Sequence, residues 1–371
     1  MRFAPAHLED WLRDSYFTAR YDLGCSGVNS WSYRELRELL GLGTDFFDDV
    51  VFDDSPSFGA ETTRTAVARR WGDGDPDRVM VTHGSSEAIF LVTASLLDPG
   101  DEVVVTDPCY YALDSVAEAI GCKLVRWRLD PTEDFQPDLD ALRRLITTAT
   151  RMVIVNFPHN PTGVTLTEPQ LTELVELCAE HDVFLLWDGA FADLAHDPAA
   201  PLPDPATRYH KCISLGTLSK AYGAPGLRFG WCQAAPAVLR RLLPMRDRST
   251  LALSPMVERL ATAMITQADR LLAPRLAQAR RNRGALARWI VAQGGSVDGP
   301  LAAGGVTTFL RLAVPDVPAL CERLLRQHDV LVVPGDCFGH PDRVRLGFGG
   351  PSDDFAEGLS RFSRVLGEEN Q

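Results

Sequence analysis

From about residue 76 the chain alternates short apolar runs with longer amphipathic segments. Seven runs have the length and composition of strands: 78–81, 102–106, 123–127, 152–155, 183–187, 212–215 and 228–232. Because these runs are apolar nearly throughout, they predict strands covered on both faces and hence a mostly parallel sheet. The segments between them, such as Leu171 to His181, place apolar residues on one helical face. The sequence therefore predicts an α/β layered domain.

The remainder predicts a smaller α+β domain. Residues 236–293 have a helical pattern, and the stretch from Pro255 to Gln293 is expected to bridge the two domains. Beyond it we expect a strand, a helix, two further strands and a final helix, over 306–312, 319–328, 330–333, 343–348 and up to about 366. A first helix is expected over Leu8 to Ala19. The predicted division is an N-terminal segment that packs on the small domain and the active site, a large domain, and a bridging helix with the small domain: 1–50, 51–254 and 255–371.

Composition narrows the class of protein. A chain of 371 residues with 45% hydrophobic residues can bury a large core. Its net charge of −13 does not suggest a nucleic-acid partner, and no stretch approaches the ~20 apolar residues that span a bilayer. Eight cysteines show no Cys-x-x-Cys pair and no metal-ligand spacing. We expect a cytoplasmic protein with reduced cysteines, no membrane partner and no metal site.

One lysine stands just beyond a predicted strand, among small residues. Lys220 follows the run 212–215 and has hydroxyl groups beside it. Such a lysine can hold a cofactor carbonyl as a Schiff base while Thr217, Ser219 and Arg228 bind its phosphate. A lysine in a Gly-rich surface loop would have the same local composition.

Two other strand ends carry polar groups where parallel sheets bind ligands. Ser85 and Ser86 precede the apolar run 89–97, so their hydroxyls and a free helix N-terminus could bind a phosphate, or they could form a plain N-cap. Asp188 ends the strand 183–187. Burying a carboxylate is costly unless it is paired, so this position predicts a buried cationic partner.

The segment from Ser214 to Gly230 resembles the pyridoxal-phosphate lysine segment of the fold-type I aminotransferases, class I/II, in its pattern S-x-x-T-x-S-K-x-x-G-x-P-G-L-R-x-G. Asn156-Phe-Pro-His-Asn160-Pro-Thr-Gly163 is similar to the N-P-x-N-P-T-G signature of that family. The resemblance covers nearly the whole chain. It implies a fold-type I architecture with a seven-stranded large domain, pyridoxal 5'-phosphate as the cofactor, an amino acid as the small-molecule substrate, and a homodimer.

The resemblance also implies a role for each matching residue. Lys220 binds the cofactor and removes the substrate Cα proton, Asp188 keeps the pyridine nitrogen protonated, and Asn160 donates to the phenolic oxygen. The remaining cofactor residues are a stacking ring and a phosphate cup, namely Tyr110, Ser85, Ser86, Thr217, Ser219 and Arg228. On the substrate side, Arg345 clamps the α-carboxylate, for which it fits better than Arg343, and the loop with Gly27 and Val28 closes beside that carboxylate.

Two positions depart from the family pattern. Three residues after the aspartate many relatives place a tyrosine that hydrogen-bonds the phenolic oxygen, whereas this chain has Phe191. Relatives often carry a tyrosine that reaches the phosphate in the partner subunit. Only Phe52 and Phe58 stand in that region here.

Shorter pieces resemble the capreomycidine synthase group of cyclases from viomycin and streptothricin biosynthesis, among them Leu8–Trp11, Cys25–Val28, His83–Ala88 and Leu186–Phe191. This resemblance implies a role in antibiotic biosynthesis: 3-hydroxy- or 3,4-dihydroxyarginine loses water and its guanidine adds to Cβ, which gives capreomycidine or 4-hydroxycapreomycidine. Acids should pair with the guanidinium, and the candidates by position are Glu9, Asp10 and Asp22.

Three alternatives remain open. The chain could be an ordinary amino acid aminotransferase or a pyridoxal-phosphate-dependent arginine oxidase. A transcription regulator built on the same fold is disfavoured, because roughly 50 residues before the sheet leave little room for a helix-turn-helix module.

Overall fold

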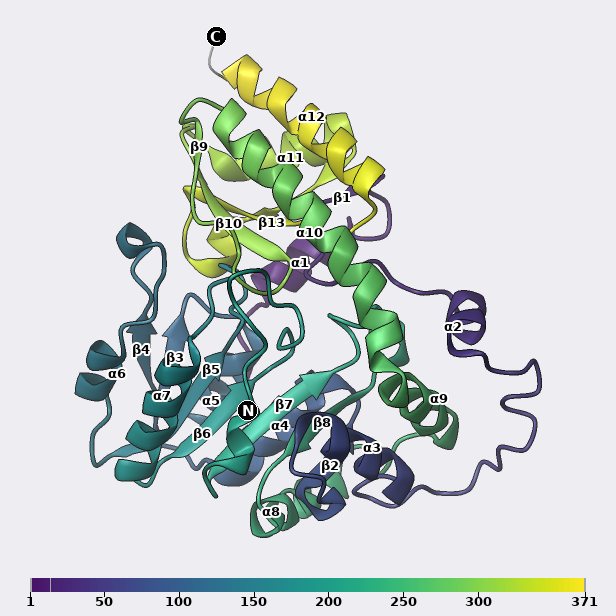
Figure 1. The fold of residues 1–371 in the computed structure, drawn as a ribbon. Coiled ribbons are helices and arrows are strands. Elements are labelled where there is room, and N and C mark those ends of the chain that lie inside the picture. Colours follow the sequence, from purple (N-terminus) through teal and green to yellow (C-terminus); the bar gives the residue numbers. More distant parts are fainter. Residues whose placement is uncertain (1, 14, 370–371) are drawn as a thin grey trace.

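The seven apolar runs form one sheet in the computed structural model, which describes residues 2–13 and 15–369 (Figure 1). The strands in spatial order are β2 (Val79–Thr82), β8 (Gly230–Gln233), β7 (Cys212–Thr217), β6 (Phe184–Asp188), β5 (Thr150–Asn156), β3 (Glu102–Asp107) and β4 (Lys123–Arg128). Neighbouring strands run parallel, except that β8 is antiparallel to both β2 and β7. The predicted mostly parallel seven-stranded sheet is therefore confirmed.

Helices cover both faces of this sheet, because side chains along a strand point alternately to opposite faces. In β3, Val103 and Val105 pack with the helices of one layer, which are α4 (Gly84–Leu96), α5 (Ala112–Ile120) and α8 (Pro236–Arg246). Val104 packs with the opposite layer, formed by α6 (Leu139–Leu145) and α7 (Glu168–Glu180). Two buried faces explain why the strands are apolar throughout.

A second sheet lies above the first (Figure 1). Its strands are antiparallel, in the order β12 (Val333–Pro334), β13 (Arg343–Gly347), β10 (Thr307–Leu312) and β9 (Val297–Asp298). Helices α11 (Val317–His328) and α12 (Ser352–Glu369) belong to this part. The N-terminal strand β1 (Tyr21–Asp22) pairs in parallel with β11 (Val330–Leu331), which attaches the N-terminal segment to the upper part.

Helix α10 (Ala268–Ala292) runs from the region of α9 (Pro255–Thr266), beside the large sheet, to the upper part, where it packs along α12 (Figure 1). The other helices are α1 (His7–Arg13), α2 (Tyr33–Leu40) and α3 (Glu61–Trp71). The domain boundaries after residues 50 and 254 stay predictions.

The structure corrects several element bounds. The first helix ends at Arg13; position 14 lies outside the described residues, and 15–18 form turns. The expected long helix is broken at Gln267, whose φ of −119° and ψ of 27° end α9 before α10 begins. The run at 330–333 divides between β11 and β12. The strand expected from position 228 begins at Gly230, because Arg228 is a left-handed turn residue with φ 54°.

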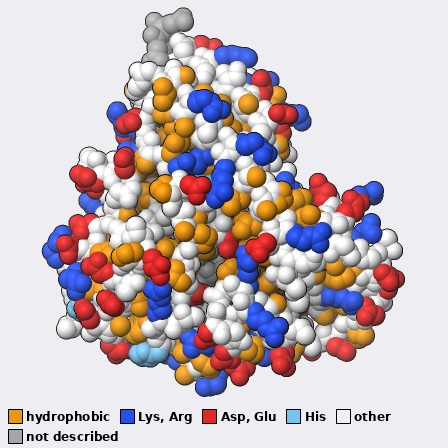
Figure 2. Space-filling model, in the orientation of Figure 1, with side chains coloured by type: hydrophobic (Ala, Val, Ile, Leu, Met, Phe, Trp, Pro, Cys, Tyr) orange, Lys and Arg blue, Asp and Glu red, His pale blue; other side chains and the backbone are white. Residues whose placement is uncertain are grey.

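The described part of the chain contains no helix long and apolar enough to cross a membrane. It also contains no group of three or more His, Cys, Asp or Glu side chains that could hold a metal ion. All eight cysteines are unpaired. Figure 2 shows acidic and basic side chains interspersed over one face of the molecule.

Candidate active site

The carboxyl ends of the parallel strands meet at one edge of the large sheet, and a cavity of about 360 Å³ lies there. Ten of the twelve predicted site residues line it: Ser85, Ser86, Tyr110, Asn160, Asp188, Thr217, Ser219, Lys220, Arg228 and Arg345. The topology of the large sheet explains the convergence of all of them except Arg345, which comes from β13 of the second sheet. Each loop that follows a parallel strand leaves the sheet at the same edge, and the turn that precedes the antiparallel strand β8 enters there too.

Lys220 lies in this cavity, and no carboxylate of residues 2–13 or 15–369 forms an ion pair with it. The chain has three lysines, and the other two, Lys123 and Lys211, form ion pairs with carboxylates. The Nζ atom of Lys220 donates a hydrogen bond of 2.8 Å to the hydroxyl of Ser26, which the N-terminal segment supplies. Burial lowers the pKa of Lys220, because the charged ammonium is poorly solvated there. The side chain is therefore more readily available as a free amine.

Asp188 lies on the floor of the cavity and is only 4% exposed. Its Oδ1 atom accepts the backbone N–H of Ala190 at 3.0 Å. Burial raises the pKa of this carboxyl to about 6, although that hydrogen bond and the charge of Lys220 oppose the rise. A buried carboxylate that is stabilised by so little positive charge is a suitable partner for the protonated nitrogen of a pyridine ring.

A second group of residues in the cavity suits a phosphate. Helix α4 begins at Gly84, whose φ is +75°, and a Cβ atom there would lie 2.5 Å from Nη2 of Arg228. Glycine thus lets the guanidinium approach the start of the helix, where backbone N–H groups are free. The hydroxyls of Thr217 and Ser219 hydrogen-bond each other at 2.9 Å on the same side. Cation, hydroxyls and helix N-terminus together form a site for a dianion.

Arg345 is 2% exposed and projects from β13 toward the cavity. Its Nη1 atom donates to Oδ1 of Asn160 at 3.1 Å, its Nη2 donates to the carbonyl of Gly24 at 2.7 Å, and its Nε is buried without a partner among the described residues. Arg343 is also buried, but it donates to the carbonyl of Phe309 and stacks over Phe135 instead. The structure therefore places Arg345, and not Arg343, at the site.

Two residues that sequence reasoning missed hold the surrounding loops. Asn156 donates to the carbonyl of Asp188 at 2.9 Å and accepts the N–H of Asn160 at 2.8 Å. His159 bridges the hydroxyl of Thr162 and the carbonyl of Pro108, and burial lowers its pKa to about 4, so it is neutral. Both belong to the same Asn-Pro stretch as Asn160, and their place in that motif is the feature of the sequence from which they could have been predicted.

Helix α1 forms one side of the cavity. Glu9 lines it and accepts a hydrogen bond of 3.2 Å from the hydroxyl of Tyr111, the neighbour of Tyr110. The other two candidates for binding a guanidinium lie elsewhere. Asp10 pairs with Arg13 at the surface, and Asp22 accepts the backbone N–H groups that open the loop at 24–25.

Gly27 and Val28 do not line the cavity, but they directly follow residues that do. The N–H of Val28 donates to the carbonyl of Lys220 at 3.0 Å, while Gly24, Cys25 and Ser26 supply the lining. Their contact with a substrate stays a prediction. Phe191 does line the cavity, with its ring centroid 5.9 Å from Nζ of Lys220, so no tyrosine hydroxyl is available at this position.

The donor set fits pyridoxal phosphate at both ends: a dianion site at the start of α4 and an uncompensated buried carboxylate at the end of β6. The fold and the cavity are those of an enzyme that depends on pyridoxal phosphate. The chain belongs to the aminotransferase class I and II family, whose sequence profile matches residues 54–362.

Individual relatives agree with this assignment. The chain is 49% identical to the capreomycidine synthase of Streptomyces vinaceus, over 98% of this chain and 94% of that protein. It is 30% identical to the arginine–pyruvate transaminase AruH of Pseudomonas aeruginosa, over 81% of this chain and 78% of the relative. Among solved structures, the pyridoxal-phosphate-dependent cyclase OrfR superposes with a TM-score of 0.94 at 42% identity, covering 99% of this chain and 98% of that one.

Proposed function

We propose that the enzyme cyclises a β-hydroxylated arginine, either 3-hydroxyarginine or 3,4-dihydroxyarginine. The substrate loses its β-hydroxyl and Cα hydrogen as water, a guanidine nitrogen bonds to Cβ, and the displaced N–H proton returns to Cα. The product, capreomycidine or 4-hydroxycapreomycidine, keeps every nitrogen of the substrate. The observation that carries the proposal is the 49% identity to a capreomycidine synthase along nearly the whole chain.

The cavity supports an arginine-like substrate. Arg345 can bind the α-carboxylate with two of the three nitrogens of its guanidinium. Glu9 and Asp188 are the acids among the described residues that line the cavity, and Asp188 is assigned to the cofactor. Within the described part of the chain, Glu9 is thus the carboxylate positioned to pair with a substrate guanidinium.

The residues then divide the work. When bound, pyridoxal phosphate supplies a ring that stabilises negative charge at the substrate Cα. Lys220 takes the Cα proton on Nζ, and burial assists because it lowers the pKa of the ammonium. Asp188 holds the positive charge of the ring nitrogen, while Arg345 fixes the orientation of the substrate backbone.

Mass spectrometry of the holoenzyme with each hydroxylated arginine, with and without 2-oxoglutarate, tests the proposal. A product lighter by one water, formed without any oxoacid and shown by NMR to contain a ring, is the expected result. Turnover that requires the oxoacid and accumulates glutamate would show an aminotransferase instead, a candidate that the similarity to the arginine–pyruvate transaminase favours. Consumption of dioxygen would indicate an arginine oxidase.

We expect Glu9→Gln to raise the KM for the hydroxylated arginine about 10- to 100-fold, since an ion pair with a buried partner contributes roughly 1.5–3 kcal/mol. Glutamine can still accept the hydrogen bond from Tyr111, so α1 should stay in place. Because Glu9 does not contact the reacting carbons, kcat should change by less than about threefold. Steady-state kinetics of the two enzymes measure both parameters.

Asp10→Asn provides the matched control. It changes an acid on the same helix that pairs with Arg13 at the surface. Its kinetics should equal those of the unchanged enzyme, because an exposed pair contributes about 0–1 kcal/mol. If Glu9→Gln left KM at the control value, Glu9 would not read the guanidinium.

We further propose a homodimer. The segment 45–58 carries exposed apolar side chains, of which Phe52 is 75% and Val51 66% exposed, and such side chains favour burial against a second copy. Light scattering coupled to gel filtration tests this directly, and a monomer at micromolar concentration would refute it. The eight unpaired cysteines support the cytoplasm as the expected compartment.

A further inference from the structure

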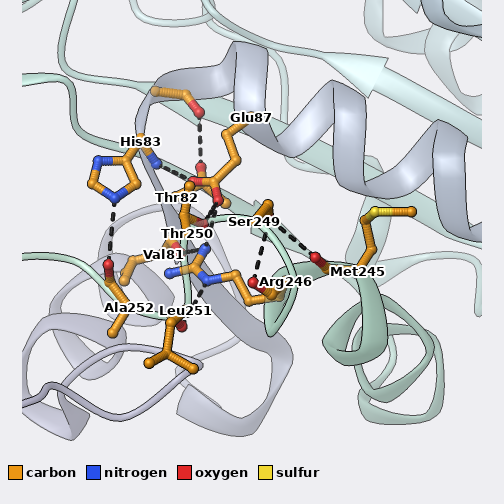
Figure 3. A network of polar contacts seen from close by, with 11 residues as sticks. Val81, Thr82, His83, Glu87, Met245, Arg246, Ser249, Thr250, Leu251 and Ala252 are labelled. Carbon is orange, nitrogen blue, oxygen red and sulfur yellow. Dashed lines mark hydrogen bonds and ion pairs between the residues drawn. The ribbon is translucent and has the colours of Figure 1, made fainter. Parts of the chain in front are cut away.

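A fully buried arginine lies behind the phosphate-binding start of α4 (Figure 3). Arg246 is the last residue of α8, and its Nη1 atom lies 3.4 Å from Oε1 of Glu87, in the first turn of α4. The same Nη1 donates to the carbonyl of Val81 at 2.9 Å, and Nε donates to the carbonyl of Leu251 at 3.1 Å. One guanidinium therefore joins β2, α4 and the segment that follows α8.

Glu87 uses both of its carboxylate oxygens in this network (Figure 3). Oε2 accepts the backbone N–H of His83 at 2.5 Å, while Oε1 accepts the hydroxyl of Thr250 and faces Arg246. The carboxylate thereby accepts the N–H of His83, which is the first backbone donor at the start of the helix. The next N–H groups, beginning at Gly84, remain free for a phosphate.

This arrangement places two anions at one helix N-terminus, since the carboxylate of Glu87 and a bound phosphate both lie there. Like charges repel strongly where water screens them little, and only 9% of the Glu87 side chain is exposed. Arg246 supplies the compensating cation. Its Nη2 atom is buried and has no hydrogen-bond partner among the described residues.

We propose that Glu87 and Arg246 are positioning residues that set the affinity of the enzyme for the cofactor's phosphate, with opposite signs. Glu87 aligns the helix start but repels the phosphate, and Arg246 offsets that repulsion from behind the helix. The inference rests on the cofactor and is independent of which amino acid the enzyme converts.

The test compares the dissociation constants of pyridoxal phosphate and of pyridoxal, which lacks the phosphate, for the apoenzyme of the full chain. Arg246→Met should raise the dissociation constant of pyridoxal phosphate roughly 10- to 100-fold, a usual range for coupling between neighbouring sites. Glu87→Gln, which keeps an acceptor for the N–H of His83, should tighten it about threefold by removing one repulsive charge. The affinity for pyridoxal should change by less than about twofold in both variants, since pyridoxal lacks the phosphate dianion.

The double variant Glu87→Gln/Arg246→Met should return the phosphate-dependent difference to near its original value, because both charges are gone. Glu102→Gln is the control, since Glu102 is a buried acid paired with Lys123 at the opposite edge of the sheet. It should leave both dissociation constants unchanged.

A network that only supports the fold would give a different pattern: pyridoxal and pyridoxal phosphate would weaken together, in both single variants. Either that pattern, or an unchanged constant for pyridoxal phosphate in Arg246→Met, overturns the proposal. Should Arg246→Met fail to fold, Glu87→Gln alone decides, because weaker or unchanged binding of pyridoxal phosphate relative to pyridoxal contradicts the expected sign.

Discussion

Replacing Lys220 with alanine should lower turnover by at least about 10⁴-fold, because the proposed mechanism gives this one side chain both the link to the cofactor and the transfer of the Cα proton. The loss should appear in kcat. Binding of the cofactor should persist in part, since Thr217, Ser219 and Arg228 still contact the phosphate end of the cavity. Steady-state kinetics and the absorbance of the bound cofactor measure the two effects separately.

The scarcity of lysine makes this experiment easy to interpret. Borohydride reduction of the holoenzyme followed by peptide mapping should label Lys220 and neither Lys123 nor Lys211, which are held in ion pairs. Lys211→Ala serves as the control and should retain full activity. Substantial turnover in Lys220→Ala, or a label on another lysine, would remove Lys220 from its assigned role.

Asp188→Asn should reduce kcat by about 10²- to 10³-fold, the usual cost of removing one preorganised electrostatic contact from an active site. Asparagine keeps the size of the side chain and can still accept the N–H of Ala190, but it loses the charge that holds a proton on the ring nitrogen. Asp193→Asn changes an acid of the same loop that hydrogen-bonds Trp71 and Tyr222. That control should keep most of the activity.

The same substitution should stabilise the apoenzyme at alkaline pH. Burial raises the pKa of Asp188 from 3.8 to about 6, so between these values the folded chain holds a proton that the unfolded chain has released. The free energy of unfolding therefore falls as pH rises through this window, by up to about 3 kcal/mol from this group. Asp188→Asn has no such loss.

Denaturant unfolding of both apoproteins tests this expectation. Their stabilities should agree near pH 4 and differ near pH 8, with the variant more stable. The comparison must be a difference between the two proteins, because burial also raises the pKa of Asp204 to about 6 and that group remains in both. Equal stability at pH 8 would show that ionised Asp188 does not destabilise the folded apoenzyme.

The prediction for Asp188 shows how far sequence reasoning reaches into the site. A carboxylate at the end of an apolar strand is recognisable because strand period and burial are local properties. The order of Asn160, Asp188 and Lys220 along the chain identifies the family. The parallel sheet then brings these residues to one edge. The cofactor site follows from these residues because each lies directly beyond a strand that the sequence predicts.

Contacts between segments far apart in the chain could not be predicted from the sequence. Arg345 contacts Gly24 across 321 positions of sequence and Asn160 across 185, and Ser26 meets Lys220 across 194. The choice between Arg343 and Arg345 depended on how the small sheet docks, because both side chains are buried. No local pattern marks the break of the bridging helix at Gln267.

The sequence by itself determined the sheet, because periodicity and strand ends are encoded over a few positions, and its resemblance to a family determined the cofactor. Only the tertiary structure decided that Glu9, and not Asp10 or Asp22, faces the cavity, and that Arg246 lies behind the phosphate helix. Both results depend on the docking of separate layers. That geometry is fixed by side-chain packing between segments far apart in the chain, which no short stretch of sequence contains.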